Sequence, residues 1–470
     1  MTALAEPAAA SFRPPAPSPR QKPPSTLQMM RIVYRNPLEL WGEPSYNEPW
    51  ISISGGIGGP LLIANDPGLI RHVLVENAKN YKMARVRQKI LRPILRDGLL
   101  TAEGEVWRRS RRAMAPVFTP RHIAGFAHPM LRKAEAFAAR YEGMVGDTVD
   151  VSRDMTLLTF DIMAETLFSG EIAGNPEDFG HQVDRLFETM GRVDPLDLLG
   201  APDWLPRITR ILGRNALAFF RDIVARTMEM RRQKLAQEGE APEDFLTLLL
   251  RAEGPDGLSR QEIEDNIITF IGAGHETTAR ALGWTIYCLA NLSGERERIE
   301  AEIDHVLATE PDPVRWLDAM PLARAAFEEA MRLYPPAPSV NREALEDDSY
   351  QDLHIPKGTQ VLVMPWTVHR HRKLWDDPEA YRPARFYPEN REKIDRFQYL
   401  PFGAGPRVCI GAAFAMQEAA IALAVLLSRY RFELTPETRP WPVQKLTTQA
   451  QGGLPMRVVR RSSHAPRRAA

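Results

Sequence analysis

A single cysteine in a glycine-rich loop places the strongest constraint on this sequence. The stretch FGAGPRVCIGAAFA, Phe402–Ala415, holds Cys409 directly before an apolar helical pattern that runs from Ala412 to Tyr430. A helix N-terminus favours a thiolate, because its free N–H groups and its dipole stabilise negative charge. Three glycines let the backbone approach a flat, bulky ligand, and they are Gly403, Gly405 and Gly411. Arg407 can pair with an anionic group on that ligand.

The composition is that of an ordinary globular protein with a sizeable core. Hydrophobic residues make up 44% and charged residues 26% of the 470, and the formal net charge is zero, so overall charge favours neither nucleic acid nor an anionic membrane. Only two cysteines are present, Cys288 and Cys409, which excludes a disulfide-rich scaffold and a four-thiolate metal site. We interpret Cys288 as a small core residue and expect a cytoplasmic monomer. No stretch reaches the ~20 apolar residues of a transmembrane segment.

Both ends of the chain have the composition of tails around one large domain. Residues 1–27 are rich in proline, with seven in the first 25 positions, and they predict a disordered N-terminal tail. Residues 461–470 predict a short basic C-terminal tail. The domain is expected over residues 28–460.

The periodicity predicts a mainly α domain with small β-sheets, an α+β fold. Helical patterns dominate from about 103 to 292. Alternating residues at 50–54 and 60–64, joined by GGIGG, predict a hairpin. Further strand signals lie at 353–364 and 454–459.

The longest predicted helix contains an unusual polar centre. Ser259 and Glu262 form a capping box, and the helical pattern then continues to about Leu292. Its middle reads FIGAGHETTAR, with two glycines and four consecutive polar residues. Thr277 can bond back to the carbonyl of Ala273, which would bend the helix and open a groove beside a buried ligand. The alternative is that the glycines serve close helix packing and that the polar run faces a buried water.

Several motifs in order resemble the cytochrome P450 family. The loop from Phe402 to Gly411 fills each position of the family's cysteine loop, and Ala273–Thr278 is similar to its oxygen-activating helix. Glu329 and Arg332 match the family's Glu-x-x-Arg, and Arg385 would complete a structural triad with them. Upstream, the Trp-x-x-x-Arg motif and a haem-facing arginine have counterparts, namely Trp107, Arg111 and Arg342.

The resemblance implies a haem enzyme and assigns roles to particular residues. The cofactor would be haem b, iron protoporphyrin IX, with Cys409 as the iron ligand. On the distal side, Thr277 would act as the alcohol beside the dioxygen site, and Glu276 would deliver protons. The remaining cofactor-binding residues implied by the resemblance are Trp107, Arg111, Ala273, Arg342, Phe402, Arg407 and Gly411.

The same resemblance implies a monooxygenase with a separate electron donor. Residues 81–112 contain ten Lys or Arg against three Asp or Glu, so an acidic ferredoxin or flavodoxin, reduced by its NAD(P)H-dependent reductase, would dock there. A solvated basic face is the alternative. Pocket segments implied at 85–103, 186–212 and 337–340 favour a hydrophobic small-molecule substrate. A thiolate-haem peroxygenase or isomerase, and a non-catalytic haem sensor, remain as alternative functions.

Overall fold

The computed structural model describes residues 12–54, 59–173, 194–198, 201–202, 204–238 and 241–461. Its helices are α1 (Thr26–Arg35), α2 (Pro67–Arg71), α3 (Arg85–Leu95), α4 (Gly104–Met114), α5 (Pro120–Ala139), α6 (Val151–Phe168), α8 (Pro195–Leu198), α9 (Ile208–Glu238), α10 (Phe245–Arg251), α11 (Arg260–Ala290), α12 (Ser293–Thr309), α13 (Trp316–Ala319), α14 (Pro321–Leu333), α15 (Pro365–Val368), α16 (Pro388–Arg391) and α17 (Ala412–Arg429). Its strands are β1 (Trp50–Ile53), β2 (Leu61–Ala64), β3 (Tyr81–Met83), β4 (Thr148–Asp150), β5 (Val340–Ala344), β6 (Asp348–Tyr350), β7 (Leu353–Ile355), β8 (Gln360–Val363), β9 (Tyr430–Leu434), β10 (Trp441–Gln444), β11 (Thr448–Gln451) and β12 (Pro455–Arg460).

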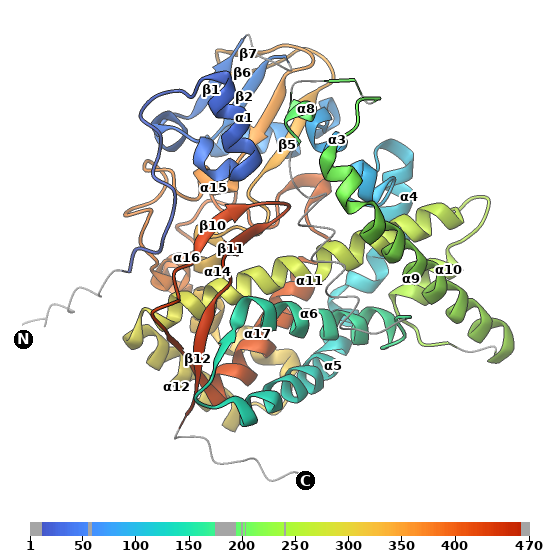
Figure 1. The fold of residues 1–470 in the computed structure, drawn as a ribbon, viewed down its shortest axis with the longest axis vertical. Coiled ribbons are helices and arrows are strands. Elements are labelled where there is room, and N and C mark those ends of the chain that lie inside the picture. Colours follow the sequence, from blue (N-terminus) through green and yellow to red (C-terminus); the bar gives the residue numbers. More distant parts are fainter. Residues whose placement is uncertain are drawn as a thin grey trace, which may run out of the picture.

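Helix α11 runs through the middle of the molecule, as its length and apolar content predict (Figure 1). Its capping box is present, because the Ser259 hydroxyl accepts from the Glu262 N–H and the Glu262 carboxylate accepts from the Ser259 N–H. It packs against α6, α9, α14 and α17, which cover it on several sides. A helix surrounded in this way needs apolar residues all round, which is the pattern that the sequence shows.

Helix α17 follows the cysteine loop directly, and Gly411 is its N-cap residue. By length and hydropathy α17 could cross a membrane, but 72% of it is buried inside the protein. It packs on α5, α11, α12 and α14 and belongs to the main hydrophobic core. Its apolar character is therefore accounted for by the core, and it fixes the cysteine loop against the centre of the molecule.

The β-structure forms small sheets, and the largest has the strand order β1-β2-β8-β5-β3. The predicted hairpin is confirmed, with β1 and β2 antiparallel and Ile51 opposite Ile63. A second sheet has the order β4-β12-β9, and β6–β7 and β10–β11 are two-stranded. Strand β5 of the large sheet carries Arg342. The β10–β11 hairpin, from the C-terminal part of the chain, packs against α11 (Figure 1).

The first residues that the structure describes, from Phe12 onward, pack on the domain, whereas the sequence predicted a disordered tail. The Tyr381 N–H donates to the carbonyl of Phe12 at 2.9 Å, and the Phe12 ring packs edge-on against Tyr287 with centroids 6.0 Å apart. The Tyr334 hydroxyl donates to the carbonyl of Pro15 at 2.8 Å. Aromatic burial and backbone pairing thus hold residues 12–20 on the domain, where the Arg20 N–H donates to the carbonyl of Trp41 at 3.0 Å. Residues 1–11 lie outside the described residues.

The C-terminal boundary falls one residue later than expected. Arg461, predicted to begin the basic tail, is buried and pairs with Asp304 at 2.7 Å. The rest of the predicted tail, 462–470, lies outside the described residues.

The predicted triad of Glu329, Arg332 and Arg385 is confirmed as a set of contacts. Arg332 pairs with Glu329 at 2.7 Å, and Arg385 reaches the same carboxylate at 3.3 Å. Arg332 also donates to the carbonyls of His369 at 2.6 Å and Ala380 at 2.9 Å. The His369 ring then accepts from the N–H of Leu400 at 2.8 Å, just before the cysteine loop. The triad therefore anchors the segment that leads into that loop.

Candidate active site

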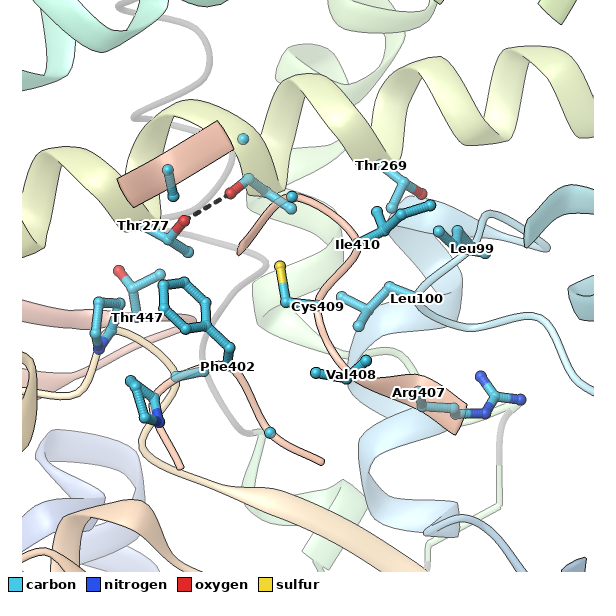
Figure 2. Close-up of a pocket in the computed structure, with 18 of the residues that line it drawn as sticks. Leu99, Leu100, Thr269, Thr277, Phe402, Arg407, Val408, Cys409, Ile410 and Thr447 are labelled. Carbon is cyan, nitrogen blue, oxygen red and sulfur yellow. Dashed lines mark hydrogen bonds between the residues drawn. The ribbon is translucent and has the colours of Figure 1, made fainter. Parts of the chain in front are cut away.

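A cavity of about 330 Å³ separates α11 from the cysteine loop. The loop supplies one wall, and Figure 2 shows the Cys409 sulfur pointing across the cavity toward α11. The opposite wall comes from the polar centre of α11, including Ala273 and Thr277. Apolar side chains complete much of the lining, namely Leu99, Leu100, Phe118, Met163, Leu167, Phe270 and Leu446. The predicted pocket segments 85–103 and 337–340 both contribute residues, whereas none of the described residues of 186–212, namely 194–198, 201–202 and 204–212, lines the cavity.

The environment of Cys409 combines opposing electrostatic effects. Burial raises the pKa of its thiol, while the Gly411 N–H and the Arg111 guanidinium act to lower it. Arg111 also donates to the carbonyl of Val408 at 2.8 Å, and the Cys409 N–H donates to the carbonyl of Phe402 at 3.0 Å. The thiol is set deep in the protein, but its surface is open to the cavity. A cation in the cavity would stabilise its thiolate form.

Two of the loop glycines are required by backbone conformation. Gly403 and Gly405 have φ of +70° and +73°, which disfavour any side chain. A Cβ on Gly405 would lie 1.8 Å from the carbonyl oxygen of Leu74, so this glycine lets the loop pack on residues 72–76. The expectation that it clears space for a ligand is therefore replaced by a packing reason. Gly411 lies at the cavity, where a Cβ would be 4.0 Å from the Cys409 sulfur.

The polar centre of α11 faces the cavity without interrupting the helix. The Thr277 hydroxyl donates to the carbonyl of Ala273 at 2.9 Å, as predicted (Figure 2). Helix α11 nevertheless continues from Arg260 to Ala290, so the expected groove arises without a break. Ala273 is exposed although it lies in the middle of the central helix, because its surface faces the cavity.

Glu276 is held by hydrogen bonds that the sequence did not predict. It lines the cavity and is buried, but its Oε1 accepts from the Thr447 hydroxyl and the Gln449 amide, each at 2.8 Å. Arg280 approaches the same oxygen at 3.5 Å. Its Oε2 has no hydrogen-bond partner among the described residues. The carboxylate is therefore tied to the β10–β11 hairpin through one oxygen only.

Cationic side chains gather at the other end of the cavity. Burial lowers the pKa of Arg342 to about 10, and the neighbouring cations Arg407 and Arg87 act in the same direction. Arg342 donates to the backbone carbonyl of Asn341 at 3.2 Å, and Arg87 to that of Ser339 at 2.9 Å. Neither has a carboxylate hydrogen-bond partner among the described residues, so the pair forms a site for anionic groups.

Arg407 and Trp107 lie together beside this cluster. The Arg407 guanidinium donates to the Glu103 carboxylate and to the carbonyl of Ala102, the latter at 2.8 Å. It also stacks over the Trp107 ring at 4.8 Å, and Figure 2 shows its side chain extending away from the Cys409 sulfur. Both residues line the cavity, as predicted, but the charge of Arg407 is already balanced within the protein.

The comparisons with known proteins agree along most of the chain. The family model for cytochrome P450 matches residues 56–456. The chain belongs to the cytochrome P450 family. Cyclooctatin synthase from Streptomyces melanosporofaciens is 33% identical over 83% of this chain and 84% of its own length. Human cytochrome P450 4F2 is 30% identical over 85% of this chain and 81% of its own length. The crystal structure of the P450 CYP102L1 superimposes with a TM-score of 0.78 at 25% identity, covering 96% of this chain and all of that one.

The cavity of this P450 fits the haem that the family carries. A sulfur faces one side of the space, unpaired cations line one end, and α11 exposes only the small Ala273 at its centre. These features suit a flat, iron-containing ring with two carboxylates. The P450 family is one of haem-thiolate monooxygenases, so the fold and the enzyme class follow from membership.

Sequence reasoning about this P450 missed residues that approach the site from distant parts of the chain. Arg87 stood within a basic run and had no local feature to separate it from its neighbours. Glu418 lies on α17, is fully buried, and has no well-formed hydrogen bond among the described residues, with the Thr278 hydroxyl as a polar neighbour. Thr447 and Gln449 lie between the helical pattern that ends at Tyr430 and the strand signal at 454–459, where no pattern was recognised.

Proposed function

We propose that this P450 inserts one oxygen atom from dioxygen into a hydrophobic small molecule, with electrons from a separate protein. The observation that carries the proposal is the cavity itself, in which the Cys409 sulfur faces Ala273 and Thr277 between largely apolar walls. The balanced reaction takes one substrate C–H bond, one dioxygen, two electrons and two protons, and yields an alcohol and water.

Haem b fits as the cofactor, with Cys409 as the residue that would ligate its iron. When bound, the haem supplies the activation of dioxygen and the oxidation of the C–H bond. Arg342 and Arg111 would hold its propionates, joined by Arg87, because buried carboxylates need paired cations. Trp107 would donate its indole N–H, while Arg407, engaged with Glu103, would act mainly by holding Trp107 and the loop.

The distal residues would manage protons. Thr277 carries a hydroxyl at the cavity wall, held by its bond to the Ala273 carbonyl. Glu276, one residue away, has an unpaired oxygen and would pass protons from the protein interior to the cavity.

The apolar lining favours a hydrophobic substrate. Hydroxyl groups at the cavity, from Thr269 and Thr447, offer few polar contacts for orienting it. Two relatives carry names that fit this chemistry, cyclooctatin synthase and the mouse leukotriene-B4 omega-hydroxylase 3, the latter 30% identical over 85% of this chain. We therefore infer an apolar substrate of fatty-acid, terpenoid or steroid type.

An acidic ferredoxin or flavodoxin, reduced by an NAD(P)H-dependent reductase, would supply the electrons. Much of the basic stretch 81–112 is occupied internally, since Arg87 donates to the carbonyl of Ser339, Arg85 pairs with Glu343 and Arg109 pairs with Glu262. Arg108 and Arg112 are exposed on α4, the helix whose Arg111 contacts the cysteine loop. These two side chains favour docking of an acidic partner next to Cys409.

An optical titration tests the proposal. The purified ferric protein is titrated with fatty acids, terpenes and steroids, and the ligand that shifts the iron from low to high spin is then used for turnover with a ferredoxin system. The expected result is hydroxylated product in proportion to NADPH consumed. Spin shifts without any product, or turnover only with added peroxide, would contradict a monooxygenase that uses a separate electron donor.

A further inference from the structure

The β10–β11 hairpin joins the wall of the cavity to the carboxylate of Glu276. Thr447 lies in the turn of this hairpin and lines the cavity beside Leu446. The same Thr447 hydroxyl donates to Glu276 Oε1 at 2.8 Å, although the two residues are 171 positions apart. Figure 2 shows Thr447 beside Phe402 and below Thr277. One side chain therefore touches both the substrate space and the acid.

Gln449 reinforces this attachment from outside the cavity. Its amide donates to Glu276 Oε1 at 2.8 Å, so two neutral donors from one hairpin converge on one carboxylate oxygen. The other oxygen, Oε2, is buried without a partner in the described part of the chain. Arg280 reaches the same oxygen at 3.5 Å. A carboxylate held at one oxygen has a favoured orientation, and the loss of one of these donors weakens that preference.

The base of the hairpin is fixed, whereas its turn meets the cavity. The Asn36 side chain donates to the carbonyl of Pro442 at 3.0 Å and accepts from the Gln444 N–H at 3.1 Å. The Thr448 hydroxyl donates to the carbonyl of Pro335 at 2.7 Å. A molecule that presses on Leu446 and Thr447 therefore displaces the Thr447 hydroxyl from Glu276, while Gln449 on β11 keeps its bond to the same oxygen.

We propose that Thr447 and Gln449 are positioning residues that orient the carboxylate of Glu276, and that a substrate pressing on the hairpin turn withdraws the Thr447 donor. The proposal rests on the proposed function, because it concerns the timing of proton delivery within the same reaction. It explains why Thr447, whose side chain lines the cavity, donates its hydroxyl hydrogen to Glu276 and not to a group in the cavity. Its consequence is that the protein without substrate wastes few electrons on hydrogen peroxide.

The test uses the holoprotein without substrate. The haem is reduced with dithionite and mixed with oxygenated buffer, and the return of the ferric spectrum is followed together with hydrogen peroxide. Overall, two ferrous haems, one dioxygen and two protons give two ferric haems and one hydrogen peroxide. Thr447→Val is expected to accelerate this return by about tenfold, the effect of losing one charge-assisted hydrogen bond.

Three comparisons separate this role from a structural one. Thr447→Ser retains the hydroxyl and should behave as the wild type, and Gln451→Leu, at the exposed end of β11, should do the same. Gln449→Leu lies off the cavity and should accelerate the return as Thr447→Val does, and it decides the matter if Thr447→Val retains no haem. In a Glu276→Gln background, neither Thr447→Val nor Gln449→Leu should accelerate the return of the ferric spectrum.

Each contrary result is distinct. An unchanged rate in both Thr447→Val and Gln449→Leu overturns the proposal, as does acceleration that persists in the Glu276→Gln background. Failure of the proposed function shows elsewhere, as spin shifts without any hydroxylated product or as turnover only with added peroxide.

Discussion

Glu329 and Arg332 form an ion pair of 2.7 Å in which both side chains are fully buried. Arg332 uses its remaining donors on backbone carbonyls, including that of Pro378 at 2.7 Å, so each charge is paired or hydrogen-bonded. Buried charges of this kind are tolerated only with complete partners. Loss of either side chain therefore leaves the other charge buried without its partner. It also removes support from the segment that leads into the cysteine loop.

Replacing Glu329 tests this dependence. Glu329→Gln leaves Arg332 and Arg385 without their carboxylate, and we expect a loss of about 3–5 kcal/mol in the free energy of unfolding. Chemical denaturation measures it, with haem content as a second readout. The matched control is Glu433→Gln, whose partner Arg457 is largely exposed, and it should cost less than about 1 kcal/mol. Equal effects of the two substitutions would contradict the role of the triad.

His369 makes the stability of the fold sensitive to acid. Burial and the neighbouring Arg332 lower its pKa from 6.5 to about 3, so the folded protein keeps it neutral while the unfolded chain protonates it. The contribution of neutral His369 is complete above pH ~6.5 and is lost as the pH falls below it, at about 1.4 kcal/mol per pH unit. His369→Gln should remove that part of the slope.

Urea denaturation from pH 7 to pH 5 measures the slope. His275 and His371 also have lowered pKa values, so a shallower dependence remains in the variant. Substitution of the exposed His305 by glutamine is the matched control and should leave the slope unchanged. A His369→Gln protein with the full wild-type slope would show that the ring does not stay neutral in the fold.

Glu418 has the opposite effect on the pH dependence of stability, because it makes the fold less stable as the pH rises. Burial raises its pKa well above the usual value, so the folded protein retains the proton that the unfolded chain releases above pH ~4.5. Stability is therefore lost as the pH rises through and above that value. The isosteric Glu418→Gln should match the wild type near pH 4.5 and exceed it in stability at pH 8. A variant less stable than the wild type at pH 8 would indicate an ionised, paired Glu418.

Docking of the electron donor should depend on Arg108 and Arg112. Arg108→Glu with Arg112→Glu reverses two exposed charges beside the helix that contacts the cysteine loop, and we expect the rate of reduction by an acidic ferredoxin to fall about tenfold at low salt. Stopped-flow reduction at several salt concentrations measures it. The exposed Arg439→Glu, before β10, should leave the rate unchanged. Equal rates in all three proteins would place docking on another surface.

The elements that could be predicted from the sequence are those with local causes. The capping box at Ser259 and the hairpin between β1 and β2 follow from neighbouring residues, and both are present. The order of the motifs brought Cys409 and Thr277 together because the family resemblance supplied the long-range geometry. The contacts of residues 12–20 could not be predicted, since composition describes the free chain, and contacts such as Phe12 with Tyr287 are made only in the folded one.

The rest of the site depends on contacts that no local pattern encodes. Glu276 is bound by residues 171 and 173 positions away, so the sequence could identify it as an acid on the central helix and could not identify what holds it. Arg87 became distinguishable from nine other basic residues only when burial and its proximity to Arg342 were visible.

The central claim is that Cys409 ligates a haem iron as a thiolate, and the carbon monoxide spectrum of the reduced protein tests it most directly. Wild-type protein is predicted to show the long-wavelength Soret band of a thiolate ligand. Cys409→Ser and Cys409→Ala are predicted to lose that band, and Cys288→Ala, at a buried cysteine away from the cavity, to keep it. A thiolate-type spectrum that survives in Cys409→Ala would contradict the account.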